Sequence, residues 1–421
     1  MTQQIEQLYS IFRKKGVLTT DSRTISDGCI FAALKGEHFD GNDFALKVAE
    51  QGIAAAVIAD RDDIPNHPRI FKVENTLTAL QQLANLHRKT LKTPIIGITG
   101  TNGKTTTKEL ISAVLKKKFD IINTEGNFNN HLGVPLTLLR IQIETQLAVV
   151  EMGANHPGEI KELCEIVEPD YGIITNIGKA HLEGFGDFQG VVNTKKALYD
   201  YLRGNNGTAI VNGANPLLMS LSEGIKRVCY NQEKSSAASN PYLTVTLNSL
   251  QIKTQLVGEY NFENVMTAVA VGRLFKVNDA DIKDAIEGYK PTNNRSQIIK
   301  TLHNELIMDA YNANPTSMDA AVRNFAKIRK EHPMLIIGDM RELGDESQSE
   351  HRKIISLVEE CGFKEVFLVG EEMTSAAEGR FTTFENTDEL CDFLKMHRVT
   401  DKHILIKGSR GIRLEKVLEY L

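Results

Sequence analysis

The sequence predicts an α/β protein of three domains, with a central parallel-sheet domain between two other α/β domains. At roughly 150 residues per domain, 421 residues correspond to about three domains. From Thr93 onward, short apolar runs alternate with amphipathic helical patterns, which is typical of a parallel sheet covered by helices. A turn-rich segment, PTNNR at 291–295, separates this pattern from a second one. We therefore place the domains at 1–92, 93–296 and 297–421.

Composition and charge exclude several protein classes. Hydrophobic residues make up 41% and charged residues 24%, which argues against disorder or a fibrous repeat. The net charge of -5 gives no general basic field, so we expect no nucleic-acid partner. Five cysteines without a CxxC pair favour reduced thiols over a disulfide or zinc scaffold. No window approaches the ~20 apolar residues of a membrane span, and no secretory signal begins the chain. We expect a soluble, cytoplasmic monomer.

The first domain mixes short apolar runs with helical patterns, as a small α/β domain does. His87 falls on the apolar stripe of a predicted helix, where a histidine is more often a packed residue than a ligand, and we assign it no function. The apolar runs are 30–34, 54–58 and 69–73, and the stripe comprises Leu77, Leu80, Ala84 and Leu91.

The other two domains show regular alternation of strand and helix patterns. We read the polar stretch at 231–242 as a connection between strands. In the central domain we predict strands at 95–99, 147–151 and 171–176, and helices after the first strand, at 189–202 and at 261–275. In the third we predict a strand pair within 298–309, a helix after Pro315, and strands at 334–337, 366–369 and 404–407.

The strongest motif is GITGTNGKTTT at 97–107, between an apolar strand and an amphipathic helix. Its glycines let backbone N–H groups approach phosphate oxygens, Lys104 can reach the terminal phosphates, and Thr105 can bind Mg²⁺. A chance glycine turn is the alternative to this nucleoside triphosphate site. The loop departs from GxxxxGK[ST], since Ile98 stands where that pattern has glycine. Adenine is favoured because TNIGKAH at 175–181 lacks the acidic end of the guanine-specific NKxD element. The predicted P-loop ATP contacts are Gly100, Thr101, Asn102, Gly103, Lys104, Thr105 and Thr106.

Polar residues that follow predicted strands are the metal candidates. Glu151 ends an apolar strand, so its carboxylate should lie at the carboxyl edge of the sheet, where parallel α/β folds bind ligands. A hard oxygen donor there suits Mg²⁺, although a glutamate paired with a surface cation is the alternative. Asn176 and His181 follow the next strand and should reach the same edge. His181 is either a ligand or a hydrogen-bonding loop residue.

Three cations are candidates only with further support. Lys195 and Lys196 lie on one predicted helix, where two lysines usually form a solvated face. Arg295 lies at the domain boundary, where it can reach across a cleft toward a transferring phosphoryl group or can simply be salt-bridged.

Taken together, the motifs resemble the Mur ligases, through all three domains. Those most like the member that adds D-alanyl-D-alanine to UDP-N-acetylmuramoyl-tripeptide are DSR at 21–23, FAALKGEHFDG at 31–41, YNANP and KGSR. The wider set is GTNGKTTT, EMGA, TNIGKAHLEGFG, YNFEN at 260–264, MDAYNANPTSM at 308–318, GDMRELG at 338–344 and KGSR at 407–410.

The resemblance implies ATP-driven amide ligation in peptidoglycan synthesis through an acyl phosphate, with a nucleotide-sugar domain, a central ATPase domain and a C-terminal Rossmann-like domain. It implies that Lys104 holds phosphates, that Thr105 and Glu151 bind one Mg²⁺, and that His181 binds a second. Lys195 aligns with a lysine that CO₂ carbamylates in the family; this exchanges an ammonium for an anionic oxygen donor. Lys195 fits better than Lys196 because Ala197, Leu198 and Tyr199 follow in the family's order.

The remaining implied contacts come from all three domains. Asn294 stands where the family commonly has glycine, but asparagine tolerates the left-handed conformation, so the turn can be kept. Ser22 and Arg23 are implied for the uridine diphosphate, with capping of a turn as the alternative for Asp21. Further implied contacts are Asn261 and Asn264 near adenine, Arg295 near the γ-phosphate, Asp309 and Tyr311 over ribose or base, and Asn129 and Asn130 on the nucleotide-sugar side.

Two other readings stay open. A diaminopimelate- or lysine-adding ligase should carry a DNPR-like motif, where this chain has YNANP and KGSR, and a folylpolyglutamate synthase would not be expected to carry the DSR-containing first domain. A nucleotide-dependent switch or noncatalytic scaffold would have no need for Lys104, Thr105, Glu151, His181 and Lys195 together. The third residue of the tripeptide is not determined at this point.

Overall fold

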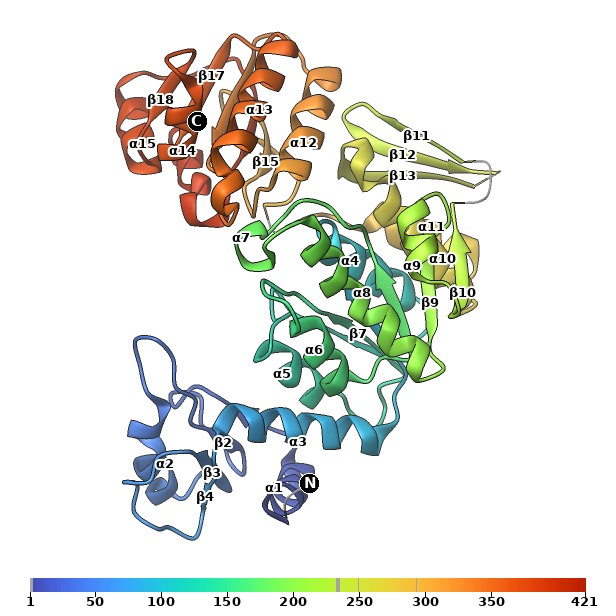
Figure 1. Ribbon diagram of the computed structural model, residues 1–421, viewed down its shortest axis with the longest axis vertical. Coiled ribbons are helices and arrows are strands. Elements are labelled where there is room, and N and C mark those ends of the chain that lie inside the picture. The colour runs from blue at the N-terminus through green and yellow to red at the C-terminus, as the bar shows by residue number, and fades with distance from the viewer. Residues whose placement is uncertain (1–2, 232–234, 249, 293) are drawn as a thin grey trace.

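The computed structural model describes residues 3–231, 235–248, 250–292 and 294–421. Three regions follow one another along its long axis, from the N-terminal region at one end to the C-terminal region at the other (Figure 1). Each has its own largely parallel sheet, which confirms the predicted three-part α/β architecture. The precise domain limits stay a prediction.

The first region is a small parallel sheet with helices packed on it. Helix α3 begins at an Asn75 cap, whose side chain accepts from Thr78 N, and ends with Lys92 in the left-handed conformation. Its strands are β1 (Leu18–Thr19), β2 (Ile30–Ala32), β3 (Ala56–Ala59) and β4 (Ile70–Lys72), in that order, and its helices are α1 (Gln3–Lys15), the 3₁₀ helix η1 (Gly41–Phe44), α2 (Ala45–Gln51) and α3 (Thr76–Leu91).

The central region is a six-stranded parallel sheet in the order β10-β9-β8-β5-β7-β6. Its strands are β5 (Ile95–Thr99), β6 (Ile121–Asn123), β7 (Leu147–Glu151), β8 (Tyr171–Ile174), β9 (Thr208–Asn212) and β10 (Lys226–Tyr230). Its helices are α4 (Lys104–Leu115), α5 (Gly133–Leu139), α6 (Glu159–Val167), α7 (Leu182–Phe185), α8 (Phe188–Gly204), α9 (Pro216–Leu221), the 3₁₀ helix η2 (Glu259–Asn261), α10 (Phe262–Leu274) and α11 (Asp279–Gly288). The predicted strands at 95–99 and 147–151 are confirmed residue for residue.

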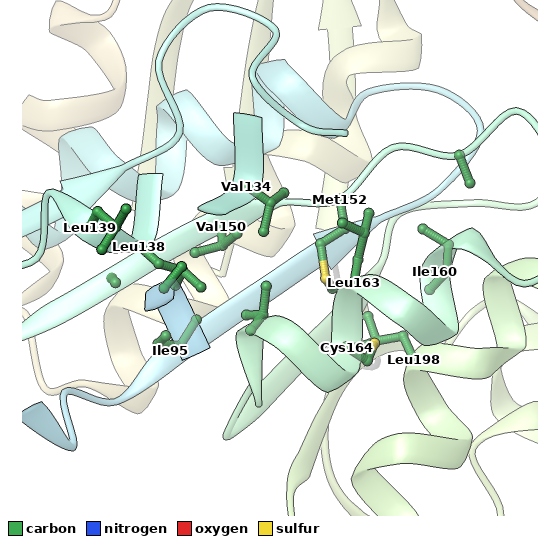
Figure 2. Packing of buried hydrophobic residues seen from close by; sticks show 14 of the residues in the cluster. Ile95, Val134, Leu138, Leu139, Val150, Met152, Ile160, Leu163, Cys164 and Leu198 are labelled. Atoms are coloured by element: carbon green, nitrogen blue, oxygen red, sulfur yellow. The ribbon is translucent and has the colours of Figure 1, made fainter. Parts of the chain in front are cut away.

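Helices cover both faces of the central sheet, as the continuous apolar strands require. Alternate residues of β7 belong to different apolar clusters: Ala148 and Val150 pack with α5, α6 and α8, whereas Leu147 and Val149 pack with α4, α10 and α11. Figure 2 shows part of the first cluster, where Val150 lies beside residues of α5 and α6. The carboxyl ends of β5, β7 and β8 are left for the loops that carry the site.

The segment predicted as a simple connection is partly a strand. Ser235–Ser239 forms β11, which pairs antiparallel with β12 (Tyr242–Leu247), and β12 pairs with β13 (Leu250–Val257). The interpretation of 235–239 as a connection was therefore wrong; residues 232–234 of that segment lie outside the described residues. The small serine and alanine side chains of β11 are mostly solvent-facing, so backbone pairing rather than apolar periodicity defines this strand.

The third region is a six-stranded sheet in the order β14-β15-β19-β16-β17-β18, antiparallel only between β14 and β15. Its strands are β14 (Gln297–Lys300), β15 (Glu305–Asp309), β16 (Pro333–Gly338), β17 (Glu365–Val369), β18 (Thr382–Phe384) and β19 (His403–Lys407). Its helices are α12 (Pro315–Ile328), η3 (Gly344–Glu346), α13 (Ser347–Glu360), α14 (Glu371–Ala377), α15 (Thr387–Met396), η4 (Arg410–Ile412) and η5 (Leu414–Tyr420). Among the helices that the structure describes, none is long and apolar enough to cross a lipid bilayer.

Candidate active site

A cavity of about 860 Å³ lies between the central and third regions, at the carboxyl ends of the central strands. Most of the predicted site residues line it, although they come from widely separated parts of the chain. They are Thr101, Asn102, Gly103, Lys104, Thr105, Thr106, Asn129, Asn130, Glu151, His181, Asn261, Asn264, Arg295, Asp309 and Tyr311, together with Asn176. Gly100, Lys195, Ser22 and Arg23 do not line it.

The loop between β5 and α4 needs glycine at two positions. Gly100 has φ +144°, and a Cβ there would lie 2.0 Å from the Thr175 hydroxyl oxygen. Gly103 has φ +79°, and a Cβ there would lie 2.4 Å from Asn264 Oδ1. A side chain would therefore be both strained and obstructed at either position. The result is a tight loop that leads directly into the N-terminus of α4, as a phosphate-binding loop does.

Lys104 is folded back onto its own loop. Its Nζ donates to the carbonyl oxygens of Gly100 at 2.7 Å and Thr101 at 3.0 Å. Burial lowers the pKa of Lys104, an effect that Glu151 opposes and Arg295 strengthens. Because phosphate oxygens would restore the lost solvation of the ammonium, the lysine is well placed to exchange its carbonyl contacts for a phosphate.

Glu151 has one carboxylate oxygen fully engaged and the other without a hydrogen bond. Oε1 accepts from Thr105 Oγ1 at 3.2 Å and from Asn129 Nδ2 at 2.8 Å. Within the part of the chain that the structure describes, the buried Oε2 has no hydrogen-bond partner, and Lys108 Nζ lies 4.0 Å from it. A buried anionic oxygen beside a threonine hydroxyl fits a hard divalent cation.

The described residues contain no group of three or more histidine, cysteine, aspartate or glutamate side chains arranged to hold a metal. A cation at Glu151 would therefore have to complete its shell with phosphate oxygens and water, which is the usual arrangement for Mg²⁺.

The two adjacent lysines of α8 differ in how deeply they are buried. Lys195 is 2% exposed, and its Nζ lies 5.4 Å from the centre of the Phe185 ring. Burial, followed by the charge of Lys104, lowers the pKa of Lys195 well below its ordinary value. Lys196 instead points outward and contacts both oxygens of Asp200 at 2.8 Å. Lys195 is thus a buried amine with a lowered pKa, although it does not line the cavity wall.

His181 lines the cavity and also contacts the third region. Its Nδ1 lies 2.5 Å from Glu342 Oε2, and this contact lowers the pKa of Glu342. Close by, Lys179 donates to Glu346 at 2.9 Å and to Glu350 at 3.0 Å. The loop that carries His181 is therefore held between two regions, and its role as a metal ligand stays a prediction.

Two asparagines support the opposite wall of the phosphate loop. Asn264 Oδ1 accepts from Thr107 Oγ1 at 3.0 Å, and Asn264 Nδ2 donates to Asn261 Oδ1 at 2.9 Å. Asn261 Nδ2 in turn donates to the Val257 carbonyl oxygen at 2.8 Å. This series of hydrogen bonds fixes the start of α10 against α4, at the side of the cavity where we expect adenine.

Arg295 stacks on an aromatic ring from the third region. Its guanidinium carbon lies 3.6 Å from the centre of the Tyr311 ring, and Arg410 lies 5.6 Å from the same ring. Asn294 has φ +50°, which confirms that asparagine adopts the left-handed turn here. Arg295 Nε is buried and has no hydrogen-bond partner among the described residues, so the side chain still has a donor to offer a ligand.

Asp309 is held by contacts from two segments. Its Oδ2 accepts from Lys407 Nζ at 2.6 Å, and its Oδ1 accepts from Ser296 N at 3.0 Å. Lys407 is itself 2% exposed, so this ion pair is well shielded from solvent. The carboxylate is thereby fixed at the cavity wall.

The candidate residues of the first region lie outside this cavity. Arg23 is 87% exposed at its side chain and pairs with Asp21 at 2.7 Å. Asp21 Oδ1 also accepts from Arg23 N at 2.9 Å, which is the turn-capping alternative for Asp21.

Asn130 Oδ1 accepts from Gly133 N at 2.9 Å at the start of α5. Contacts of Ser22, Arg23, Asn129 and Asn130 with a nucleotide sugar stay predictions.

Four residues of the site were not assigned from the sequence: Asn314, Lys407, Glu342 and Lys108. Asn314 and Lys407 lie within motifs that were recognised, YNANP and KGSR, so the signal was present but unassigned. Glu342 likewise lies within the recognised motif GDMRELG, although its partner His181 is 161 positions away. Lys108 carries no local signal, because its partner Glu151 is 43 positions away.

Three family models match the chain in order. They are described as Mur ligase family, catalytic domain, at residues 16–88, Mur ligase middle domain at 98–272, and Mur ligase, glutamate ligase domain, at 294–410.

Relatives and solved structures match over nearly the whole chain. A Bacillus subtilis protein named UDP-N-acetylmuramoyl-tripeptide--D-alanyl-D-alanine ligase is 35% identical, covering 96% of this chain and 92% of its own. The crystal structure of MurF from Acinetobacter baumannii is 30% identical with a TM-score of 0.86, over 99% of this chain and 97% of that one. MurF ligase from Thermotoga maritima in complex with ADP is 25% identical with a TM-score of 0.85, over 100% and 98%.

Proposed function

This chain belongs to the Mur ligase family, and from that premise we propose that it uses ATP to join D-alanyl-D-alanine to UDP-N-acetylmuramoyl-tripeptide. The product is the pentapeptide precursor of peptidoglycan, and ADP and phosphate are released. The observation that carries the proposal is the cavity in which the phosphate loop, Glu151 and the Arg295–Tyr311 stack meet. The relatives named for this reaction cover almost the entire chain.

In the proposed reaction, the terminal carboxylate of the tripeptide attacks the γ-phosphorus of ATP, and ADP leaves. The amine of D-alanyl-D-alanine then attacks the acyl carbon, phosphate leaves, and the amine loses a proton. Because phosphoryl transfer depends mostly on positioning and charge, the chain needs cations and donors rather than a nucleophile of its own. Lys104 and Arg295 would supply the charge, from the loop and from the boundary of the two regions.

We propose that Thr105 and Glu151 hold Mg²⁺ with the nucleotide phosphates, since Oε2 of Glu151 is buried and no described residue hydrogen-bonds to it. The ion would neutralise charge on the phosphates. His181 is proposed to serve a second ion after exchanging its contact with Glu342. Lys195 is proposed to be carbamylated by CO₂, and the lowered pKa of its amine supports this because the neutral amine is the form that reacts.

We further propose that Asn261 and Asn264 border the adenine, that Asp309 and Tyr311 contact ribose or base, and that Gly100 to Thr106 surround the phosphates. Ser22, Arg23, Asn129 and Asn130 are proposed for the nucleotide-sugar side. Ser22 and Arg23 come from the first region, so they would join the site only when the substrate bridges the regions, whereas Asn129 and Asn130 already line the cavity. The protein is proposed to act as a cytoplasmic monomer.

The test is phosphate release with ATP, Mg²⁺ and UDP-N-acetylmuramoyl-tripeptide, with and without D-alanyl-D-alanine, together with the product mass. We expect a product heavier by one dipeptide less water, formed only with both substrates. Comparing tripeptides with lysine or diaminopimelate would identify the third residue. Absence of product from both tripeptides, with ATP still bound, would overturn the proposed activity.

A further inference from the structure

The phosphate loop and the third region are joined by a reciprocal pair of side-chain amides. Asn314 Nδ2 donates to Asn102 Oδ1 at 2.8 Å, and Asn102 Nδ2 donates to Asn314 Oδ1 at 3.4 Å. Asn102 lies two residues before Lys104, whereas Asn314 lies 212 positions away from Asn102 at the start of α12. Both residues line the cavity. The pair therefore spans the boundary that must close around the reactants.

Asn102 is held rigidly by its backbone. Its N–H donates to Asn176 Oδ1 at 2.9 Å, and its carbonyl oxygen accepts from Thr175 Oγ1 at 2.6 Å and from Asn176 Nδ2 at 3.0 Å. Because these bonds occupy both backbone groups, the side-chain amide is left to face the third region. The position of the Asn102 side-chain amide therefore depends on the conformation of the phosphate loop.

Asn314 is held equally firmly at the other end. Its Oδ1 accepts from Ser317 N at 2.9 Å, and its own N–H donates to Ser317 Oγ at 3.1 Å, which forms a capping box. Pro315 follows as the first residue of the helix. Asn314 is 8% exposed, and its amide pair with Asn102 is partly buried, which limits competition from water.

Other contacts also cross the boundary. Lys179 contacts Glu346 and Glu350, whose side chains are 44% and 6% exposed, and Arg295 stacks on Tyr311. These contacts involve residues outside the phosphate loop. The partly buried amide pair ties the third region to the phosphate loop itself.

We propose that Asn314 is a positioning residue whose amide pair with Asn102 holds the third region closed on the phosphate loop while the acyl phosphate exists. This rests on the proposed function. If closure fails, water attacks the acyl carbon in place of the acceptor amine; the C–O bond to phosphate breaks and the carboxylate re-forms. The net reaction is then ATP and water giving ADP and phosphate, without ligation. Asn314 thus governs how tightly ATP consumption is coupled to ligation.

Three variants test the proposal while keeping a helix cap. Asn314→Ser caps α12 but is too short to reach Asn102, and Asn314→Asp retains one bond by accepting from Asn102 Nδ2. The matched control is Asn386→Ser, because Asn386 caps α15 in the same region by accepting from Glu389 N at 3.0 Å, away from the cavity.

Two hydrogen bonds of ordinary strength correspond to roughly a fivefold to 150-fold change in the ratio of closed to open forms. We expect Asn314→Ser to raise the ratio of phosphate released to product formed at least about fivefold. Asn314→Asp should lie between, and Asn386→Ser should match wild type. An unchanged ratio in both Asn314 variants would overturn the proposal.

A second measurement separates this proposal from the proposed function. Small-angle X-ray scattering of the full chain with ADP should show a more open form in Asn314→Ser than in wild type or Asn386→Ser. Equal scattering in all three would overturn the amide pair as the closing contact, even if ligation is observed. If the wild-type protein does not ligate but Asn314→Ser is more open than wild type, the proposed function is contradicted. The closing role of the amide pair is then still supported.

Discussion

Replacing Lys195 with methionine is expected to stabilise the metal-free protein and to remove part of the pH dependence of its stability. Lys195 is 2% exposed, and burial lowers its pKa well below the ordinary value. Between that lowered pKa and about 10.4, the unfolded chain binds one proton that the folded chain does not. Stability in this window therefore rises with pH, by about 1.4 kcal/mol per pH unit.

Methionine has an unbranched apolar side chain that can follow the path of the lysine stem beside Phe185. The variant should therefore be more stable than wild type at neutral pH, and the difference should shrink by about 1.4 kcal/mol for each pH unit within the window. Urea unfolding at several pH values, in CO₂-free buffer with a chelator, measures the free energy of unfolding of each protein.

The neighbouring Lys196→Met variant is the matched control. The Lys196 side chain is 37% exposed and pairs with Asp200 at 2.8 Å near the surface, so its loss should change stability by less than about 1 kcal/mol. Parallel pH profiles for wild type and Lys195→Met would refute the reasoning. The reasoning would also be refuted if the free energy of unfolding changed its pH dependence in Lys196→Met and not in Lys195→Met. That result would show that Lys196 is the lysine with the lowered pKa.

Three further outcomes are expected. Glu151→Gln should raise the Mg²⁺ concentration for half-maximal activity at least about tenfold, because it removes the anionic oxygen; an unchanged Mg²⁺ titration would contradict the metal assignment. Tyr311→Ala should lower kcat/KM for ATP about 2- to 30-fold, since a cation–π contact is worth about 0.5–2 kcal/mol, whereas Tyr311→Phe should keep the stack and most of the activity. His87→Gln should weaken the loss of stability on acidification below pH ~6.5, because burial lowers the pKa of His87 and the unfolded chain alone takes up the proton; equal thermal shifts from pH 7.5 to 5.5 in both proteins would exclude His87 as the cause.

Local sequence was sufficient wherever one segment carries both the structure and the chemistry. The glycine-rich loop, its flanking strand and helix, and the strand that ends at Glu151 could be predicted because their residues are neighbours in the chain. The left-handed turn at Asn294 was also predictable, since it depends on the backbone preferences of one residue. Strand β11 was missed because its small serine and alanine residues lack apolar periodicity, and long-range pairing creates the strand.

The sequence by itself therefore determined the α/β class, the phosphate loop and the family. Only the tertiary structure decided which lysine of α8 is buried, which oxygen of Glu151 lacks a hydrogen bond, and that Asn102 meets Asn314. The physical reason is that burial and pairing depend on which segments pack together, whereas loop and strand propensities depend on residues close in the chain. A site assembled at the edges of two sheets is complete only when both sheets are in place.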